Sequence, residues 1–287
     1  MVITMFENNI SVIIPMYNAE LTIVDALESL RLQSKFEFIK EIIVINDGSI
    51  DKSHDVVTEY ARQYEEMPIT LIDTVNRGVS SARNTGEMHS KTDWIAFLDA
   101  DDVWFPNKLE RQCEVIAKSG CGIDVLGTAW DNKCLRIGTK VVKELHRGTV
   151  REICIKNFPQ PSTVLMKKSV FDDIGGFDKK QHYAEDGNFF LKAAAKFGLY
   201  YLPEQLIEYG HGKRGFGDSG LSGNLKAMQL GMVKNLKEMR SLGYISKQFY
   251  YLMRVFYVLK YWRRIILTYI LGVKPIGKRC EYYNSSV

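Results

Sequence analysis

Short apolar runs alternate along the first hundred residues with stretches in which apolar residues recur at helical spacing. Between the first two runs, Ile23, Leu27 and Leu30 lie three or four residues apart, which is typical of a buried helix face. Strands and helices in this order form a mostly parallel sheet covered on both faces. The pattern therefore predicts an α/β fold. The predicted strands cover residues 10–14, 41–45, 69–72 and 94–98, and the helices after the second and third strands cover about 56–64 and 80–89.

Acidic residues gather where two of these strands end. Asp47 follows the second strand, and Asp99, Asp101 and Asp102 follow the fourth. In open sheets, ligands bind outside the carboxyl ends of the strands. A buried, unpaired charge costs several kcal/mol, so these acids need a partner. Two carboxylates one residue apart suit Mg²⁺ or Mn²⁺ with a phosphate ligand. For Asp102 the alternative is the N-cap of the helix near Pro106, and we expect that role for it.

The remainder of the first 224 residues is less regular. It predicts strands at 124–130 and 163–166, a helix at 188–197 and a glycine-rich polar loop at 211–223. Neither a dinucleotide-binding fingerprint nor a P-loop is present, so phosphates must be held in another way.

The amino-acid composition is typical of a folded protein. Of the 287 residues, 46% are hydrophobic and 25% are charged, which are globular values. Five cysteines without C-x-x-C spacing argue against a disulfide framework or a zinc site and favour a reducing compartment. No secretory signal and no long uncharged apolar stretch is visible, so we expect a cytoplasmic protein that does not span a membrane.

Charge is distributed unevenly along the chain. Residues 225–287 carry 12 Lys and Arg against 2 Asp and Glu, whereas residues 1–224 carry 26 against 32. Within this basic tail an amphipathic helix is predicted, with Lys260, Arg263 and Arg264 beside its apolar stripe. Either the helix lies on an anionic membrane surface, or it packs on the preceding domain by the same stripe. Nucleic-acid-binding motifs are lacking, so we expect no nucleic acid partner. The stripe consists of Leu252, Val255, Leu259, Trp262, Ile266, Ile270 and Val273.

Several segments between about residues 10 and 211 resemble, in order, the signatures of family 2 of the inverting nucleotide-sugar glycosyltransferases. The resemblance implies the GT-A fold, a Rossmann-like, mostly parallel sheet flanked by helices. It implies a catalytic domain at 1–224, with a nucleotide-binding half at about 10–110 and an acceptor half at about 111–224. The C-terminal tail at 225–287 follows it. The segments are Ser11 to Asn18, Ile45 to Asp51, Asn76 to Gly86, Phe97 to Asp102, Gly175 to Asp178 and Tyr183 to Asp186.

The resemblance also assigns roles on the donor side. Pro15, Tyr17 and Asp47 would line the nucleoside pocket, and Arg83 would approach the nucleotide. Taken alone, Asp47 before Gly48 also suits a simple turn.

The same resemblance implies a metal site. Asp101 would bind the metal, and Asp99 would contact the ribose or reach the metal through water. His211 would complete the metal shell as a similarly placed His does in some relatives, although a lone His in a glycine-rich loop is often merely solvated.

On the acceptor side, the resemblance makes Asp186 the general base and Glu185 a contact for the acceptor. A sugar hydroxyl is a poor nucleophile, so a carboxylate must take its proton as it attacks. The two acids equally suit a helix N-terminus, which would lower the pKa of Asp186 and keep it ionised.

The implied function is Mn²⁺- or Mg²⁺-dependent transfer of one sugar from a nucleotide-diphosphate sugar, expected to be a UDP-sugar. The acceptor would be a glycan or lipid-linked intermediate of bacterial polysaccharide, such as O-antigen, capsule or lipopolysaccharide. The enzyme would lie on the inner face of the cell membrane. One alternative is a nucleotidyltransferase acting on a sugar phosphate. Another is a non-catalytic membrane-surface module on a transferase scaffold.

Overall fold

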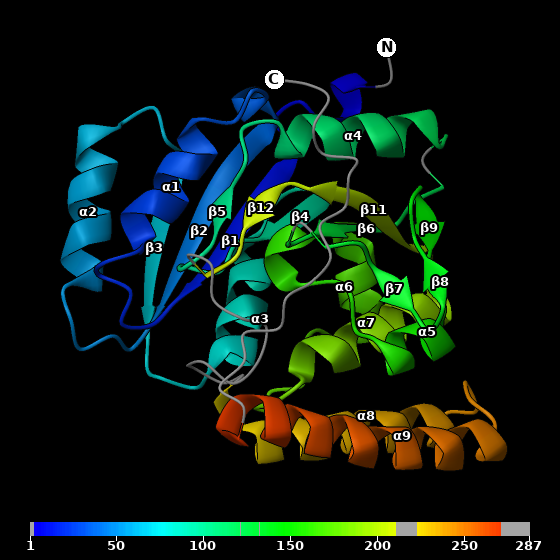
Figure 1. Ribbon diagram of the computed structural model, residues 1–287. Coiled ribbons are helices and arrows are strands. Elements are labelled where there is room, and N and C mark those ends of the chain that lie inside the picture. The colour runs from blue at the N-terminus through cyan, green and yellow to red at the C-terminus, as the bar shows by residue number, and fades with distance from the viewer. Residues whose placement is uncertain (1–2, 121, 132, 211–222, 271–287) are drawn as a thin grey trace.

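An eight-stranded sheet forms the centre of the protein (Figure 1). The computed structural model describes residues 3–120, 122–131, 133–210 and 223–270. The strand order is β3-β2-β1-β4-β10-β6-β11-β9. The strands are β1 (Ile10–Met16), β2 (Ile39–Asp47), β3 (Ile69–Thr74), β4 (Trp94–Phe97), β6 (Val125–Ala129), β9 (His146–Arg147), β10 (Leu165–Lys167) and β11 (Leu199–Gln205), with the separate pairs β5 (Val103–Trp104) and β12 (Ile207–Glu208), and β7 (Arg136–Ile137) and β8 (Lys140–Val141).

Helices cover both faces of the sheet, as the sequence predicts. Side chains of α1, α2 and α4 pack on one face, and those of α3 and of α5 to α9 pack on the other. The helices are α1 (Ile23–Arg31), α2 (Ser53–Gln63), α3 (Val79–His89), α4 (Lys108–Lys118), α5 (Val150–Ile155), α6 (Lys168–Ile174), α7 (Glu185–Lys196), α8 (Leu225–Ser241) and α9 (Lys247–Ile265), with 3₁₀ turns at Ile3–Phe6, Phe36–Phe38 and Pro161–Thr163 and a π-helical turn at Ile266–Ile270.

The first half of the sheet is parallel, which confirms the predicted fold class. β3, β2, β1 and β4 all pair in parallel. The strand β10 runs antiparallel between β4 and β6, so the sheet is mixed. Side chains of β1 alternate between two cores, with Val12 and Ile14 in one and Ile13 in the other. Because β1, β2 and β4 run parallel to one another, their carboxyl ends lie at the same edge of the sheet.

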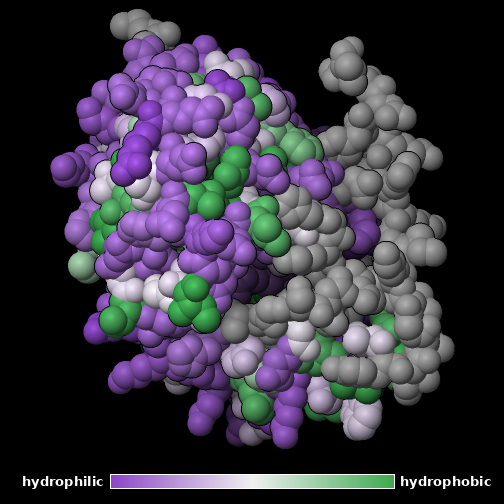
Figure 2. Space-filling view, turned by 90° about the vertical axis from the view of Figure 1, so that its left-hand side faces the viewer, coloured by the Kyte–Doolittle hydropathy of each residue, from purple (hydrophilic) through white to green (hydrophobic). Residues whose placement is uncertain are grey.

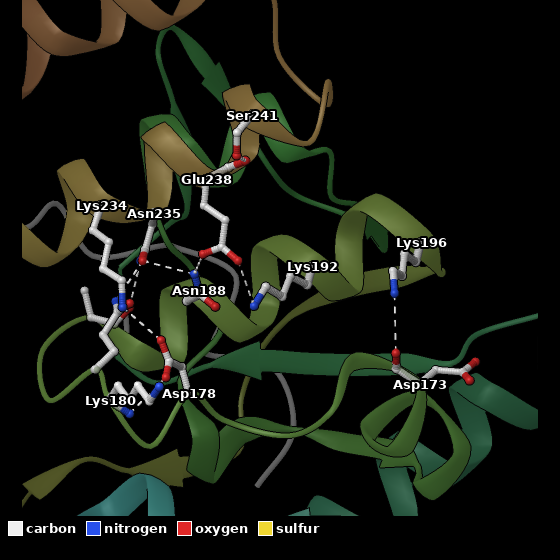
Figure 3. Close-up of polar contacts among 12 residues, drawn as sticks. Asp173, Asp178, Lys180, Asn188, Lys192, Lys196, Lys234, Asn235, Glu238 and Ser241 are labelled. Carbon is white, nitrogen blue, oxygen red and sulfur yellow. Dashed lines mark hydrogen bonds and ion pairs between the residues drawn. The ribbon is translucent and has the colours of Figure 1, made fainter.

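The two C-terminal helices pack side by side beneath α7 (Figure 1). Leu236 and Met239 of α8 and Met253 and Tyr257 of α9 are buried in the second core, together with side chains of α7. Figure 3 shows polar contacts that fasten α8 to α7 and to the loop before it. These contacts include Asn188 with Asn235 and Glu238, Lys192 with Glu238, and Asp178 with Lys234.

The tail thus packs on the domain through side chains other than its predicted stripe. Residues of the stripe from Leu252 to Ile266 are exposed instead. The domain division at residue 224 stays a prediction. None of the helices in the described ranges is both long and apolar enough to cross a membrane. Among the described cysteines, Cys113 and Cys154 are free and buried, and Cys134 is disulfide-bonded.

Candidate active site

Asp47 lies at the end of β2 and holds the loop that leads to α3. Its Oδ1 accepts the backbone N–H of Arg77 at 2.9 Å and its Oδ2 accepts that of Gly78 at 2.8 Å. Gly78 has a φ of 86°, a conformation that favours glycine. Pro15 is buried within β1, and Tyr17 follows it with half of its surface exposed. Asp47 therefore does hold a turn, while the roles of these three residues toward a nucleoside stay predictions.

Arg83 joins the two halves of the site. Its guanidinium donates to Asp99 Oδ1 at 2.7 Å and to Glu185 Oε1 at 3.4 Å, and it lies over the ring of Phe177. The Arg83 side chain is only 4% exposed. A charge buried this deeply is tolerated because carboxylates compensate it. Arg83 therefore binds protein carboxylates, and its predicted approach to the nucleotide stays a prediction.

Glu185 and Asp186 form the first turn of α7, as the alternative interpretation of this pair predicts. The preceding Ala184 has a φ of 56°, in the left-handed region, and starts the helix abruptly. Asp186 Oδ2 accepts a hydrogen bond from Asn157 at 3.2 Å. Glu185 pairs with Arg83, and the charge of Asp186 also acts on Arg83.

Burial dominates the acidity of this pair. It raises the pKa of Asp186, although the backbone N–H of Gly187 acts in the opposite direction. Burial and the neighbouring Asp186 raise the pKa of Glu185 to about 7. The prediction that the helix N-terminus lowers the pKa of Asp186 is therefore wrong, because desolvation outweighs the helix end.

Asp102 does not cap a helix. The strand β5 follows it at once, and α4 begins only at Lys108. Asp102 is 1% exposed, and its Oδ1 accepts the backbone N–H of Gly210 at 2.7 Å. Its Oδ2 has no hydrogen-bond partner among the described residues. Burial and the charges of Asp99 and Asp101 raise the pKa of Asp102 to about 8. The helix-cap prediction failed because the partner of Asp102 is distant in sequence.

The carboxylates at this edge fit a divalent cation. Asp99, Asp101 and Asp102 follow one another at the end of β4. The buried Arg83 pairs with Asp99 and with Glu185 of α7, which leaves more carboxylates than cations among these residues. This excess of negative charge favours a bound cation. The described residues contain no group of three or more His, Cys, Asp or Glu arranged to hold a metal. Mg²⁺ needs only one or two carboxylates when phosphate and water supply the other ligands. His211 lies outside the described residues.

Comparison with known proteins identifies the family. Residues 11–175 match the family model of glycosyl transferase family 2. The chain belongs to this family. It is 30% identical over 190 residues to an uncharacterized glycosyltransferase of Haemophilus influenzae, covering 64% of this chain and 61% of that protein. The chain thus spans less than two thirds of the length of this relative.

Two further similarities extend the comparison. The minor teichoic acid biosynthesis protein GgaB of Bacillus subtilis is 43% identical over 99 residues, which cover 34% of this chain and 11% of GgaB. The structure of S. aureus TarS 1–349 in complex with UDP superimposes with a TM-score of 0.59 at 19% identity, covering 93% of this chain and 76% of that chain. The GT-A fold expected from the sequence is therefore confirmed.

The structure brings together Arg83, Asp99, Glu185 and Asp186, which are up to 103 positions apart. Two residues that support this group have no signal in the sequence. Ser162 Oγ accepts the backbone N–H of Asp99 at 3.0 Å, and Asn157 donates to Asp186. Neither residue lies in a recognisable motif, so no local signal could have identified them.

Proposed function

We propose that this glycosyltransferase family 2 member is a metal-dependent, inverting enzyme that transfers one sugar from a UDP-sugar. The observation that carries this proposal is the double ion pair of Arg83, because it joins Asp99 of the Asp99-Ala100-Asp101 turn to Glu185 of α7, the neighbour of Asp186. A leaving-group site and a proton acceptor then face the same space. Transfer of a sugar to a hydroxyl needs both.

On the donor side, Asp101 would hold Mn²⁺ or Mg²⁺ and Arg83 would orient Asp99. When bound, the metal neutralises negative charge on the departing nucleoside diphosphate. Pro15, Tyr17 and Asp47 would bind the nucleoside at the ends of β1 and β2. The complex of TarS with UDP, which has this fold, supports a uridine nucleotide.

On the acceptor side, Asp186 would remove the proton of the attacking hydroxyl. The acceptor oxygen forms a bond to the anomeric carbon while the bond from that carbon to the diphosphate oxygen breaks on the opposite face. The proton goes to Asp186, and the nucleoside diphosphate carries away the electron pair. Asn157 donates to Asp186 Oδ2 at 3.2 Å and so orients the carboxylate. Attack from the opposite face inverts the anomeric centre.

The acceptor would be a glycan or lipid-linked intermediate of a bacterial surface polysaccharide. The similarity to GgaB, a teichoic acid biosynthesis protein, supports this class of product. It does not favour O-antigen or lipopolysaccharide over other polymers.

Replacing Asp186 by Asn tests the proposal. With a panel of UDP-sugars and Mn²⁺, transfer is expected to fall about 100-fold or more, since general-base catalysis contributes at least that much. UDP binding, measured by calorimetry, should change little. The matched control is Asp173→Asn, an exposed acid on α6 that should have no effect. Retained transfer would contradict the base assignment. Release of pyrophosphate from a nucleoside triphosphate would favour the nucleotidyltransferase, and inactivity with every nucleotide sugar would favour the non-catalytic module.

A second part of the proposal concerns α9, which would rest on the inner face of the cell membrane. Its outward stripe carries Leu252, Val255, Leu259 and Trp262, each between 58 and 65% exposed. In Figure 2 hydrophobic residues occur among hydrophilic ones at the lower edge, the edge at which α8 and α9 lie in Figure 1. Large apolar side chains at this density mark an interaction site.

Basic side chains around this stripe favour an anionic lipid surface. Lys247 and Arg254 lie on one side of the stripe and Arg263 on the other, and all three are exposed. A polybasic, amphipathic helix of this kind lies in the membrane interface.

Sedimentation with vesicles tests the membrane contact. The double variant Val255→Gln and Leu259→Gln should lose binding to phosphatidylglycerol-containing vesicles. The control Met88→Gln removes an equally exposed apolar side chain from α3 and should bind normally. Equal binding of wild type and the double variant would refute the membrane contact.

A further inference from the structure

The C-terminal helix α9 supplies two hydrogen-bond donors to the end of α5, above it in Figure 1. The hydroxyl of Tyr257 donates to the carbonyl oxygen of Cys154 at 2.7 Å. Lys260 Nζ donates to the carbonyl oxygen of Ile155 at 3.3 Å. Residues three apart on a helix lie on the same side of it, so Tyr257 and Lys260 can reach α5 together.

These two bonds complete the end of α5. The last carbonyl groups of a helix have no partner within that helix. In α5, the backbone N–H of Lys156 bonds to the carbonyl of Glu152, and the final two carbonyls belong to Cys154 and Ile155. The donors from α9 reach those two groups. The end of α5 therefore depends on α9 for its hydrogen bonds.

Both donors are held against α5 by their surroundings. Tyr257 is 4% exposed, and Gln229 of α8 donates to its carbonyl oxygen at 2.9 Å. Burial and three neighbouring cations lower the pKa of Lys260 to about 7. A lysine usually extends its ammonium group into water, so the bond to Ile155 offsets the cost of this position. The neighbouring cations are Arg264, Lys156 and Arg263.

The segment that follows α5 carries a contact of the proposed base. Asn157 lies two residues after Ile155, and its Nδ2 donates to Asp186 Oδ2 at 3.2 Å. The side chain of Asn157 is exposed, so burial does not fix it. The next residue, Phe158, is 2% exposed and packs against the ring of Tyr201. The segment is thus anchored by α9 before Asn157 and by the second core after it.

We propose that Tyr257 and Lys260 are positioning residues for Asp186, acting through the end of α5 and Asn157. The proposal rests on the proposed function, which makes Asp186 the general base. The match to the family model ends at residue 175, so α9 contributes to the site from outside the matched region. The tail then serves catalysis directly, in addition to its proposed contact with the membrane.

Tyr257→Phe tests the proposal, because it removes the hydroxyl and keeps the ring that packs in the second core. The kcat for sugar transfer should fall about three- to tenfold, the usual worth of one hydrogen bond. The KM for the donor should not change. The acidic limb of kcat should move to higher pH, because the bond from Asn157 lowers the pKa of Asp186. Lys260→Met should shift both properties in the same direction.

The matched control is Tyr250→Phe. Tyr250 also lies on α9, but its hydroxyl accepts a hydrogen bond from Arg254 of the same helix at 2.8 Å. This variant should leave kcat and the acidic limb unchanged. Adding Tyr257→Phe to Asn157→Ala should have no further effect on either property, since both substitutions act on the same bond.

Unchanged kcat and an unmoved acidic limb in Tyr257→Phe would overturn the proposal. So would a lower melting temperature with an unmoved limb, because α9 would then only stabilise the fold. Effects that add fully to those of Asn157→Ala would also overturn it.

The Asp186→Asn variant separates this proposal from the proposed function. If Asp186→Asn retains transfer, the base assignment fails and the positioning role fails with it. If Asp186→Asn is inactive while Tyr257→Phe transfers like the wild type, the positioning role alone fails.

Discussion

Arg83 and Asp99 form an ion pair of 2.7 Å in which the guanidinium is almost completely buried. The same guanidinium reaches Glu185 on α7. Because the two carboxylates come from opposite halves of the domain, a single side chain sets how the Asp99 turn and α7 face each other. Substitution of Arg83 should therefore affect folding and catalysis together.

Arg83→Met is expected to lower the free energy of unfolding by about 3 kcal/mol, because it leaves the buried Glu185 and the half-buried Asp99 without compensation. Arg83→Lys keeps the charge but loses the planar guanidinium. It should therefore be more stable than Arg83→Met and still transfer sugar more slowly than the wild type. Urea unfolding and kcat measured on both variants check this. Equal activity of Arg83→Lys and the wild type would show that the fork geometry is unimportant.

The pH dependence of transfer follows from Asp186. A general base must be ionised, and burial raises the pKa of Asp186. Activity should therefore fall as the pH drops, at a higher pH than the ordinary aspartate value of about 3.9. The hydrogen bond from Asn157 lowers the pKa of Asp186, so Asn157→Ala should move this acidic limb to still higher pH. Profiles of kcat against pH for both proteins test the shift, and an unmoved limb would contradict it.

Gly231 lets α8 approach the loop before α7. A Cβ at this position would overlap the backbone carbonyl of Tyr183. Gly231→Ala should therefore push α8 away and destabilise the protein by about 1–3 kcal/mol, as overpacking usually does. Thermal unfolding should show the loss, and transfer should weaken because Tyr183 leads into Asp186. Lys237→Ala, on the exposed side of α8, serves as the control and should leave both properties unchanged.

Lys108 is fully buried in α4, where its Nζ donates to Gln112 Oε1 at 2.8 Å and lies over the ring of Trp104. Burial lowers the pKa of Lys108 well below its ordinary value. Between the folded and unfolded pKa values the unfolded chain binds the extra proton, so stability rises with pH there. Compared with the wild type, Lys108→Met should gain most in unfolding free energy near pH 7 and less near pH 10. Urea unfolding at both pH values tests this, with the exposed Lys118→Met as control. A difference that does not depend on pH would contradict the lowered pKa.

The sequence predicts much of the fold because period-2 and period-3.6 patterns are local. The strands β1, β2, β3 and β4 lie where the apolar runs predict them. The antiparallel direction of β10 could not be predicted, because the direction of a strand depends on the path that the chain takes before it. β1 also continues through Pro15 to Met16, because a proline without an N–H can still lie in register opposite Ile45.

The site was harder to predict, because its contacts join distant segments. Asp102 illustrates this, since its partner Gly210 lies 108 positions away. The raised pKa of Asp186 depends on surroundings that several elements supply, and only the helix end was visible in the sequence. The apolar stripe of the tail was found by periodicity alone. Periodicity could not show that Met253 and Tyr257, outside that stripe, make the contact with the domain.

The two apolar faces of α9 have a practical consequence for handling the protein. An exposed face that includes Leu252, Leu259 and Trp262 is an aggregation liability in water without a partner surface. Deleting the helix would not solve the problem, because removing Met253 and Tyr257 would uncover the second core. Purification should therefore retain α9 and shield its outer face with detergent or lipid.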